Sequence, residues 1–301
     1  MSFAGLALTA QRVEEASDLH ATMSDILLAF AAAALMAVTL AYGLKFVRHR
    51  DAVAADWRHP VLVSFFAPYG MTLVLIAAAL QYQQAPLAHP IWIAGTALLA
   101  ATAFATLAGW ILHKDLQPAH LLPVWFLPLV GPTLIAQAGV RLGYPEISAT
   151  ALAFAVLGWL AFLPLVLQRL IFGPPIPPPM LPSLAILVAP EALIFISWTE
   201  VNGGLTEIGR LLFGVTTVMG ILVLVLAPRL LRSPFSLAWW AFSFPIAAWS
   251  SATLKYAAAT GSQFHLQAGR VLFVAVAAMT ALLTLRTLHA ALRGDLTRPP
   301  A

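Results

Sequence analysis

One face of the apolar segment 237–258 carries side chains of a kind and spacing suited to controlling a narrow passage. Counted along the chain, the members of this face are Phe244, Ala248, Ser251 and Lys255. In a helix these positions lie on one side, with Lys255 about 16 Å beyond Phe244. An aromatic ring above a groove of small residues forms a hydrophobic constriction that opens by wetting or by ring rotation. From spacing alone, a phenylalanine packed in an ordinary core explains Phe244 at least as well.

A second candidate is Glu191, which directly follows Pro190 in an apolar segment. A carboxylate in the middle of a membrane costs several kcal/mol unless it is neutralised, paired or hydrated. A proton-coupled carrier would use such a group by protonating it as an anion passes. The simpler interpretation, which we favour, is a neutral Glu191 hydrogen-bonded to a carbonyl that the proline frees.

Other polar groups are weaker candidates for contact with an anion, and most are expected to bond to their own helix. They are Ser64, Thr72, Gln81, Thr133, Gln137, Ser197, Ser243 and Thr253. The chain has no cysteine, and its eight histidines include no metal-binding spacing such as HExxH. No nucleophile–base arrangement is present either. We therefore expect neither an enzyme nor a bound cofactor or metal.

The composition decides which class of protein holds these residues. Of 301 residues, 61% are hydrophobic and only 9% are charged, whereas soluble domains carry roughly a quarter charged residues. This predicts an integral membrane protein, embedded in a lipid bilayer and not bound to nucleic acid. No alternating barrel pattern occurs, so we expect helices. Runs long enough to span a bilayer lie at about 23–47, 60–81, 90–112, 121–140, 145–170, 181–200, 205–230, 237–258 and 265–290.

These runs predict one transmembrane domain over residues 1–301. Residues 1–11 form a tenth apolar piece that covers only about half a bilayer, which we interpret as a partial first helix. Residues 23–293 hold helices two to ten. Residues 294–301 are a short tail.

The basic residues predict the orientation of the chain, because cytoplasmic loops are enriched in Lys and Arg. One side of the membrane receives 11 of the 16 basic residues and the other side receives 5. The richer side carries Lys45, Arg48, Arg50, Arg58, Lys114, Arg169, Arg229, Arg232, Arg286, Arg293 and Arg298. The poorer side carries Arg12, Arg141, Arg210, Lys255 and Arg270. We therefore expect a multi-pass protein of the inner cell membrane with a cytoplasmic C-terminus.

Prolines recur at similar depth in alternate spans. Pro68, Pro132, Pro190 and Pro245 lie eight to eleven residues into the third, fifth, seventh and ninth helices. Irregular backbone at membrane depth is tolerated where protein or a water-filled cavity covers it. The pattern therefore predicts kinked odd helices around a central pore and even helices outside them, although prolines are also common in membrane helices generally.

Two motifs resemble one membrane family. Residues 58–68 are RHPVLVSFFAP and residues 238–257 are AWWAFSFPIAAWSSATLKYA, with weaker likeness in LVAPEALIFISW (187–198) and LPVWFLPLVGPTLIAQAG (122–139). Together they resemble the tellurite-resistance/dicarboxylate transporter family, whose members include bacterial TehA and plant guard-cell slow anion channels. The likeness runs from about residue 40 to 260. Unlike the family's first helix, which opens with a proline-containing half, this chain begins MSFAGLALTAQR, as though that helix were truncated.

The resemblance implies ten helices in five quasi-symmetric hairpins, with the odd helices lining a pore. It implies that Phe244, from the S-F-P motif, occludes this pore, and that the protein is a homotrimer with one pore in each protomer. It also places Pro132 where relatives often have Asn. Family members pass chloride or nitrate, and some branches export malate, sulfite or tellurite.

Two functions remain open. The first is an anion channel or facilitator for small anions, gated by Phe244. The second is a proton-coupled exporter of C4-dicarboxylate, sulfite or tellurite, with Glu191 in the coupling.

Overall fold

The computed structural model describes residues 1–17, 20–112 and 116–293, and every regular element in these ranges is helical. The α-helices are α1 (Ser2–Glu15), α2 (Thr22–Arg48), α3 (Arg50–Arg58), α4 (Ala67–Tyr82), α5 (Ala88–Leu112), α6 (Phe126–Val130), α7 (Thr133–Gly139), α8 (Pro145–Phe172), α9 (Ala189–Val201), α10 (Glu207–Leu230), α11 (Ser243–Thr260) and α12 (Gln263–Leu292). The 3₁₀ helices are η1 (Leu62–Phe66), η2 (Pro118–His120), η3 (Pro123–Trp125), η4 (Pro178–Val188) and η5 (Leu237–Phe242). The expected tail, 294–301, lies outside the described residues.

Seven helical segments in the described part of the chain are long and apolar enough to cross a membrane. They confirm the prediction of an all-helical, multi-pass membrane protein. The predicted span 121–140 is divided into η3, α6 and α7, because its prolines interrupt the backbone hydrogen bonds of a continuous helix. In α1, 14 residues cover about 21 Å, which is less than the hydrocarbon core of about 30 Å.

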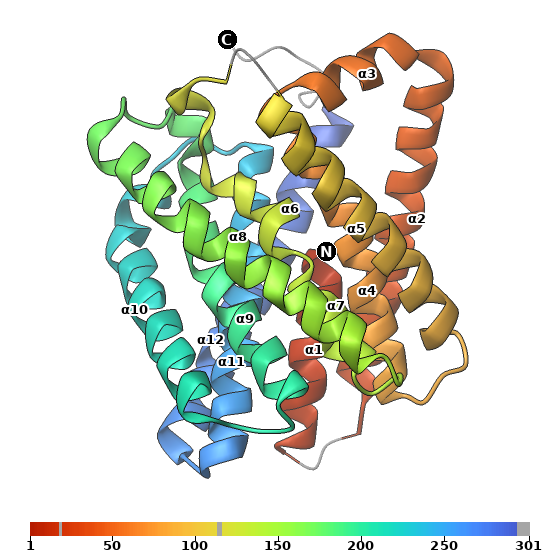
Figure 1. Cartoon of the computed structure of the whole chain (residues 1–301), viewed down its shortest axis with the longest axis vertical. Coiled ribbons are helices and arrows are strands. Elements are labelled where there is room, and N and C mark those ends of the chain that lie inside the picture. Colours follow the sequence, from red (N-terminus) through yellow and green to blue (C-terminus); the bar gives the residue numbers. More distant parts are fainter. Residues whose placement is uncertain (18–19, 113–115, 294–301) are drawn as a thin grey trace.

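The long helices alternate in direction between the end of the bundle that carries α3, at the top of Figure 1, and the opposite end. The chain begins near the middle of this height, and α1 runs from there to the opposite end. At that end Glu14 accepts hydrogen bonds from the backbone amides of Met23 and Ser24. These bonds satisfy free donors at the start of α2, so they hold α1 beside α2.

Burial separates the long segments into two groups. In the 18-residue apolar stretches of segments 62–82 and 178–201, 67% and 83% of the residues are buried. The corresponding share is between 11% and 33% in α2, α5, α8, α10 and α12. Because exposed residues of these five helices are largely apolar, such as Leu112 and Phe172, their outer faces suit contact with lipid.

Three of the four alternating prolines lie where a 3₁₀ helix gives way to an α-helix, and the fourth, Pro132, lies in the break between two α-helices. Pro68 follows η1 as the second residue of α4, and Pro190 follows η4 as the second residue of α9. Pro245 is the third residue of α11, directly after η5, and Pro132 is the N-cap of α7. A first-turn position has no intrahelical partner for its amide, so proline costs no bond there. The sequence predicted bends within continuous helices, whereas the structure shows joints between segments.

Two local features differ from the expectation. Helix α1 extends to Glu15, four residues beyond the predicted fragment 1–11. Residues 50–58 form the short helix α3, which the sequence did not predict because a polar nine-residue stretch carries no clear hydrophobic periodicity.

Candidate functional site

A largely apolar cavity of about 330 Å³ lies in the half of the bundle nearer α3, and we call it the inner cavity. Its walls come from five segments, namely α1, η1–α4, η3–α6, η4–α9 and η5–α11. Pro68, Pro190, Phe244 and Pro245 all line it. The helix joints at Pro68, Pro190 and Pro245 therefore surround one space, whereas Pro132, the fourth predicted kink, does not line it.

Phe244 closes one side of the inner cavity. Its side chain is only 3% exposed, and its ring lies against Gly5, where an added Cβ would approach the ring's Cδ2 to 2.9 Å. Hydrogen bonds hold α1 against α11 on both sides of this contact. Ser243 Oγ donates to Ser2 Oγ at 2.6 Å, and Thr9 Oγ1 donates to the Ala247 carbonyl at 3.1 Å. The absence of a side chain on Gly5 therefore makes room for the ring.

A second cavity, of about 470 Å³, lies at the opposite end of the bundle, and we call it the basic cavity. Arg12 of α1, Arg141 of the α7–α8 loop and Lys255 of α11 line it, and Glu15 is the carboxylate on its wall. Three cations from three separate elements therefore face one space. Such a concentration of one charge sign raises the local concentration of anions.

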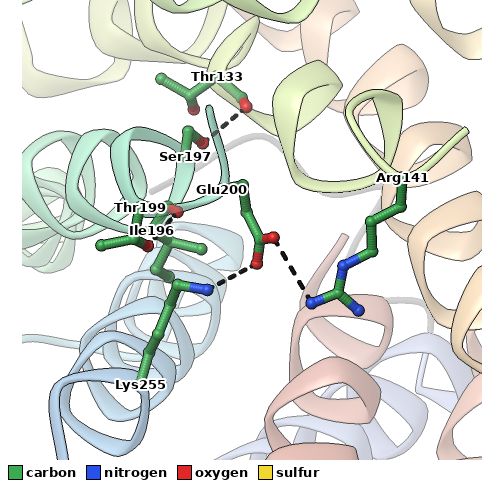
Figure 2. A network of polar contacts seen from close by, with 7 residues as sticks. All are labelled: Thr133, Arg141, Ile196, Ser197, Thr199, Glu200 and Lys255. Atoms are coloured by element: carbon green, nitrogen blue, oxygen red, sulfur yellow. Dashed lines mark hydrogen bonds and ion pairs between the residues drawn. The ribbon is translucent and has the colours of Figure 1, made fainter. Parts of the chain in front are cut away.

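Glu200, near the end of α9, neutralises part of this charge. Figure 2 shows its carboxylate between Lys255 and Arg141. Lys255 Nζ lies 2.6 Å from Glu200 Oε1, and Arg141 Nη2 lies 3.5 Å from Glu200 Oε2. The Arg141 guanidinium also lies 4.8 Å from the centre of the Tyr82 ring, which adds a cation–π contact.

The predicted face of α11 extends from the inner cavity to the basic cavity. Phe244 lines the inner cavity and Lys255 lines the basic cavity. Ala248 and Ser251 lie between them on the same face, are buried, and line neither cavity. The two spaces are therefore aligned along one helix and separated by a closed stretch that begins at the Phe244 ring.

Glu191 faces away from both cavities. It is fully buried, and its Oε1 accepts a hydrogen bond of 2.8 Å from Trp159 Nε1 in the neighbouring helix α8. Its Oε2 has no partner among the described residues. The sequence-based interpretation had a backbone carbonyl as partner, whereas the structure shows an indole.

The remaining candidates also lie outside the two cavities. Thr133 Oγ1 donates to the Val130 carbonyl, and the Thr133 carbonyl accepts from Ser197 Oγ (Figure 2). Gln137 is partly buried in α7. Across the described ranges, no group of three or more His, Asp or Glu side chains is placed to hold a metal ion.

Sequence reasoning missed three residues of this arrangement, namely Gly5, Arg141 and Glu200. The available signal for Glu200 was an acidic side chain at the end of an otherwise apolar segment. Its partner Lys255 is 55 residues further along the chain, so spacing within one helix does not reveal the pair.

The sequence was also compared with known proteins. Residues 1–288 match the family described as voltage-dependent anion channel (SLAC1). The S-type anion channel SLAH2 of Arabidopsis thaliana is 26% identical over 266 residues, covering 87% of this chain and 51% of the plant protein. The guard cell S-type anion channel SLAC1 of the same plant is 24% identical over 267 residues, covering 87% and 48% respectively.

A bacterial relative is covered over more of its length. The tellurite resistance protein TehA homolog of Haemophilus influenzae is 26% identical over 265 residues, which are 85% of this chain and 79% of that protein. The chain therefore spans about half the length of the two plant channels and about four fifths of the bacterial protein.

Proposed function

This chain belongs to the voltage-dependent anion channel (SLAC1) family, and from that premise we propose that it is an anion-selective channel or facilitator gated by Phe244. The resemblance expected from the motifs at 58–68 and 238–257 is thereby confirmed. The family consists of anion channels and transporters, so this is a transport protein and not an enzyme.

The observation that carries the proposal is the alignment of two cavities along one face of α11 with the Phe244 ring between them. The ring and its seat on Gly5 close the passage at the joint between η5 and α11. A narrow apolar passage excludes ions, because a dehydrated ion has nothing there to replace its water. Movement of one side chain is then enough to open it.

Charge supports anions as the permeant species. Arg12, Arg141 and Lys255 line the basic cavity, while the inner cavity is lined mostly by apolar residues and by no Asp or Glu. Anions therefore meet a positive entrance and then an uncharged passage. Selection by the energy of dehydration, with little discrimination between chloride and nitrate, is what such a route provides.

The finer architecture is part of the proposal. We interpret the chain as ten helices in five hairpins, with α1, η1–α4, η3–α7, η4–α9 and η5–α11 around the pore and the straighter helices outside. The greater burial of segments 62–82 and 178–201 supports this arrangement. We also propose a homotrimer in the inner cell membrane with the α3 end in the cytoplasm.

The direct test is electrical. In planar bilayers under a chloride gradient, the reconstituted protein should give currents whose reversal potential lies close to the equilibrium potential of chloride. Nitrate should carry a similar current. A reversal potential close to the equilibrium potential of the cation would contradict the proposal.

One observation keeps the proton-coupled exporter as a second candidate. Glu191 is a fully buried carboxyl group with an oxygen that has no partner among the described residues. A buried ionisable group in a membrane helix is a candidate proton carrier. Against this, it faces Trp159 and lines neither cavity.

Glu191→Gln separates the two functions. The amide oxygen of Gln still accepts the hydrogen bond from Trp159, while the group that carries a proton is gone. If the protein is a channel, anion flux measured in liposomes against pH should give the same profile in the variant and the parent. A pH dependence that the variant abolishes would establish coupling. Trp159→Phe is the structural control, and it should lower the free energy of unfolding by about 1–3 kcal/mol through the unpaired carboxyl.

A further inference from the structure

The basic cavity contains an unusual balance of charge. Arg12, Arg141 and Lys255 line it from three elements. Glu200 forms ion pairs with two of these cations, Lys255 and Arg141. The side chain of Glu200 is 10% exposed and that of Lys255 is 18% exposed. Glu200 itself does not line the cavity. The carboxylate therefore neutralises part of the positive charge that Lys255 and Arg141 present to the cavity.

This balance has a consequence for any anion that enters. Without Glu200 the cavity would hold three cations against the single carboxylate of Glu15. A small anion would then bind more firmly, chiefly to Lys255, because its side chain is only 18% exposed, against 39% for Arg141, and water screens its attraction less. Conduction requires binding strong enough for entry and weak enough for departure. A tethered carboxylate lowers the affinity by occupying the same two cations.

We propose that Glu200 is a specificity-determining residue that competes with the passing anion for Lys255 and Arg141. The inference rests on the proposed function, since it assigns a role to Glu200 in the same pathway. An anion in the basic cavity takes over the contacts with Lys255 and Arg141, and Glu200 recovers them as the anion leaves. Monovalent anions are thereby released quickly, whereas an anion of two charges, such as sulfate, competes better and stays longer.

The test is Glu200→Gln, which keeps the size of the side chain and removes its charge. The concentration of chloride that gives half of the maximal current should fall by at least about fivefold, because a unit negative charge a few ångströms from the site is lost. The maximal current should fall as well, since the anion leaves more slowly. Sulfate should block the variant at concentrations that leave the parent conducting.

Glu207→Gln is the matched control. Glu207, the first residue of α10, carries the same charge, but it does not line the basic cavity, and it pairs with Arg210 at 3.7 Å. Its loss releases neither Lys255 nor Arg141, so the half-saturating chloride concentration should change by less than about twofold. Equal shifts in the two variants would overturn the proposal.

Lys255→Gln addresses the case in which Glu200→Gln does not fold. This variant removes the cation and leaves Glu200 with Arg141, so the half-saturating chloride concentration should rise. Adding Lys255→Gln to Glu200→Gln should return the value toward that of the parent. An unchanged half-saturation in Lys255→Gln would count against the proposal.

A binding measurement distinguishes failure of this inference from failure of the proposed function. Chloride that binds the folded protein raises the midpoint of thermal unfolding in proportion to its occupancy, and this measurement on purified protein requires no conduction. If chloride stabilises Glu200→Gln at lower concentrations than the parent while no form conducts, the channel proposal fails and the competition stands. If the parent conducts and chloride stabilises both forms equally, only the competition fails.

Discussion

Phe244→Ala should raise the anion current of the protein at least about tenfold above the small current of the parent and make conduction continuous. The ring is buried between the inner cavity and the closed stretch of α11, and it fills the space in front of Gly5. Alanine leaves this space open to water and to a hydrated anion. A barrier lowered by only about 1.4 kcal/mol already gives a tenfold increase in rate. Single-channel and liposome flux recordings of both forms measure the effect.

The control for this result is Phe242→Ala. Phe242 stands two residues earlier, is equally buried, and packs against Trp239 with the ring centres 5.8 Å apart. It does not line the inner cavity. Both variants lose a buried aromatic ring, so both should lose comparable stability, yet only Phe244→Ala should raise the current above that of the parent. Current at background in a well-folded Phe244→Ala protein would refute the gate.

A cysteine at position 251 should make the opened protein sensitive to an anionic thiol reagent. The parent chain has no cysteine, so a single introduced thiol reports on one position without further engineering. Ser251 lies on the face that joins Phe244 to Lys255, in the stretch that is closed in the structure. In Phe244→Ala/Ser251→Cys, the reagent should reach the thiol through the pathway and reduce the current to near background, because the attached group fills the passage.

The neighbouring serine supplies the comparison. Ser250 is also buried, but its Oγ donates a hydrogen bond of 2.7 Å to the Gly269 carbonyl of α12. Its side chain therefore points away from the proposed pathway. Phe244→Ala/Ser250→Cys should keep its current in the same reagent. If both cysteines react equally, or if neither does while Phe244→Ala conducts, the anion takes another route and the face of α11 is misassigned.

The helices themselves could be predicted closely. The predicted spans 23–47 and 205–230 correspond to α2 at 22–48 and α10 at 207–230. Such agreement is possible because the thickness of the bilayer sets how many consecutive apolar residues a span needs. That Phe244 and Lys255 lie on one face of their helix could also be predicted, since this depends only on helical periodicity. Their role in an anion pathway is a proposal.

Other features depended on packing. The change from 3₁₀ to α-helix at Pro68 and Pro245 follows segments whose sequences, LVSFF and LAWWAF, show no distinct signal. The orientation of Glu191 toward Trp159 depends on the rotation of α9 against α8. An apolar helix with little polar asymmetry does not reveal that rotation in its own sequence.

Sequence alone determined the class of this protein, its helical spans and the family to which it belongs, because these follow from local composition and from short motifs. The tertiary structure decided that five segments share one cavity, that Gly5 seats the Phe244 ring, and that Glu200 holds Lys255 and Arg141. The physical reason is distance along the chain. Residues tens to hundreds of positions apart meet only when the whole bundle packs, and the charge and shape at such a contact are properties of no single segment.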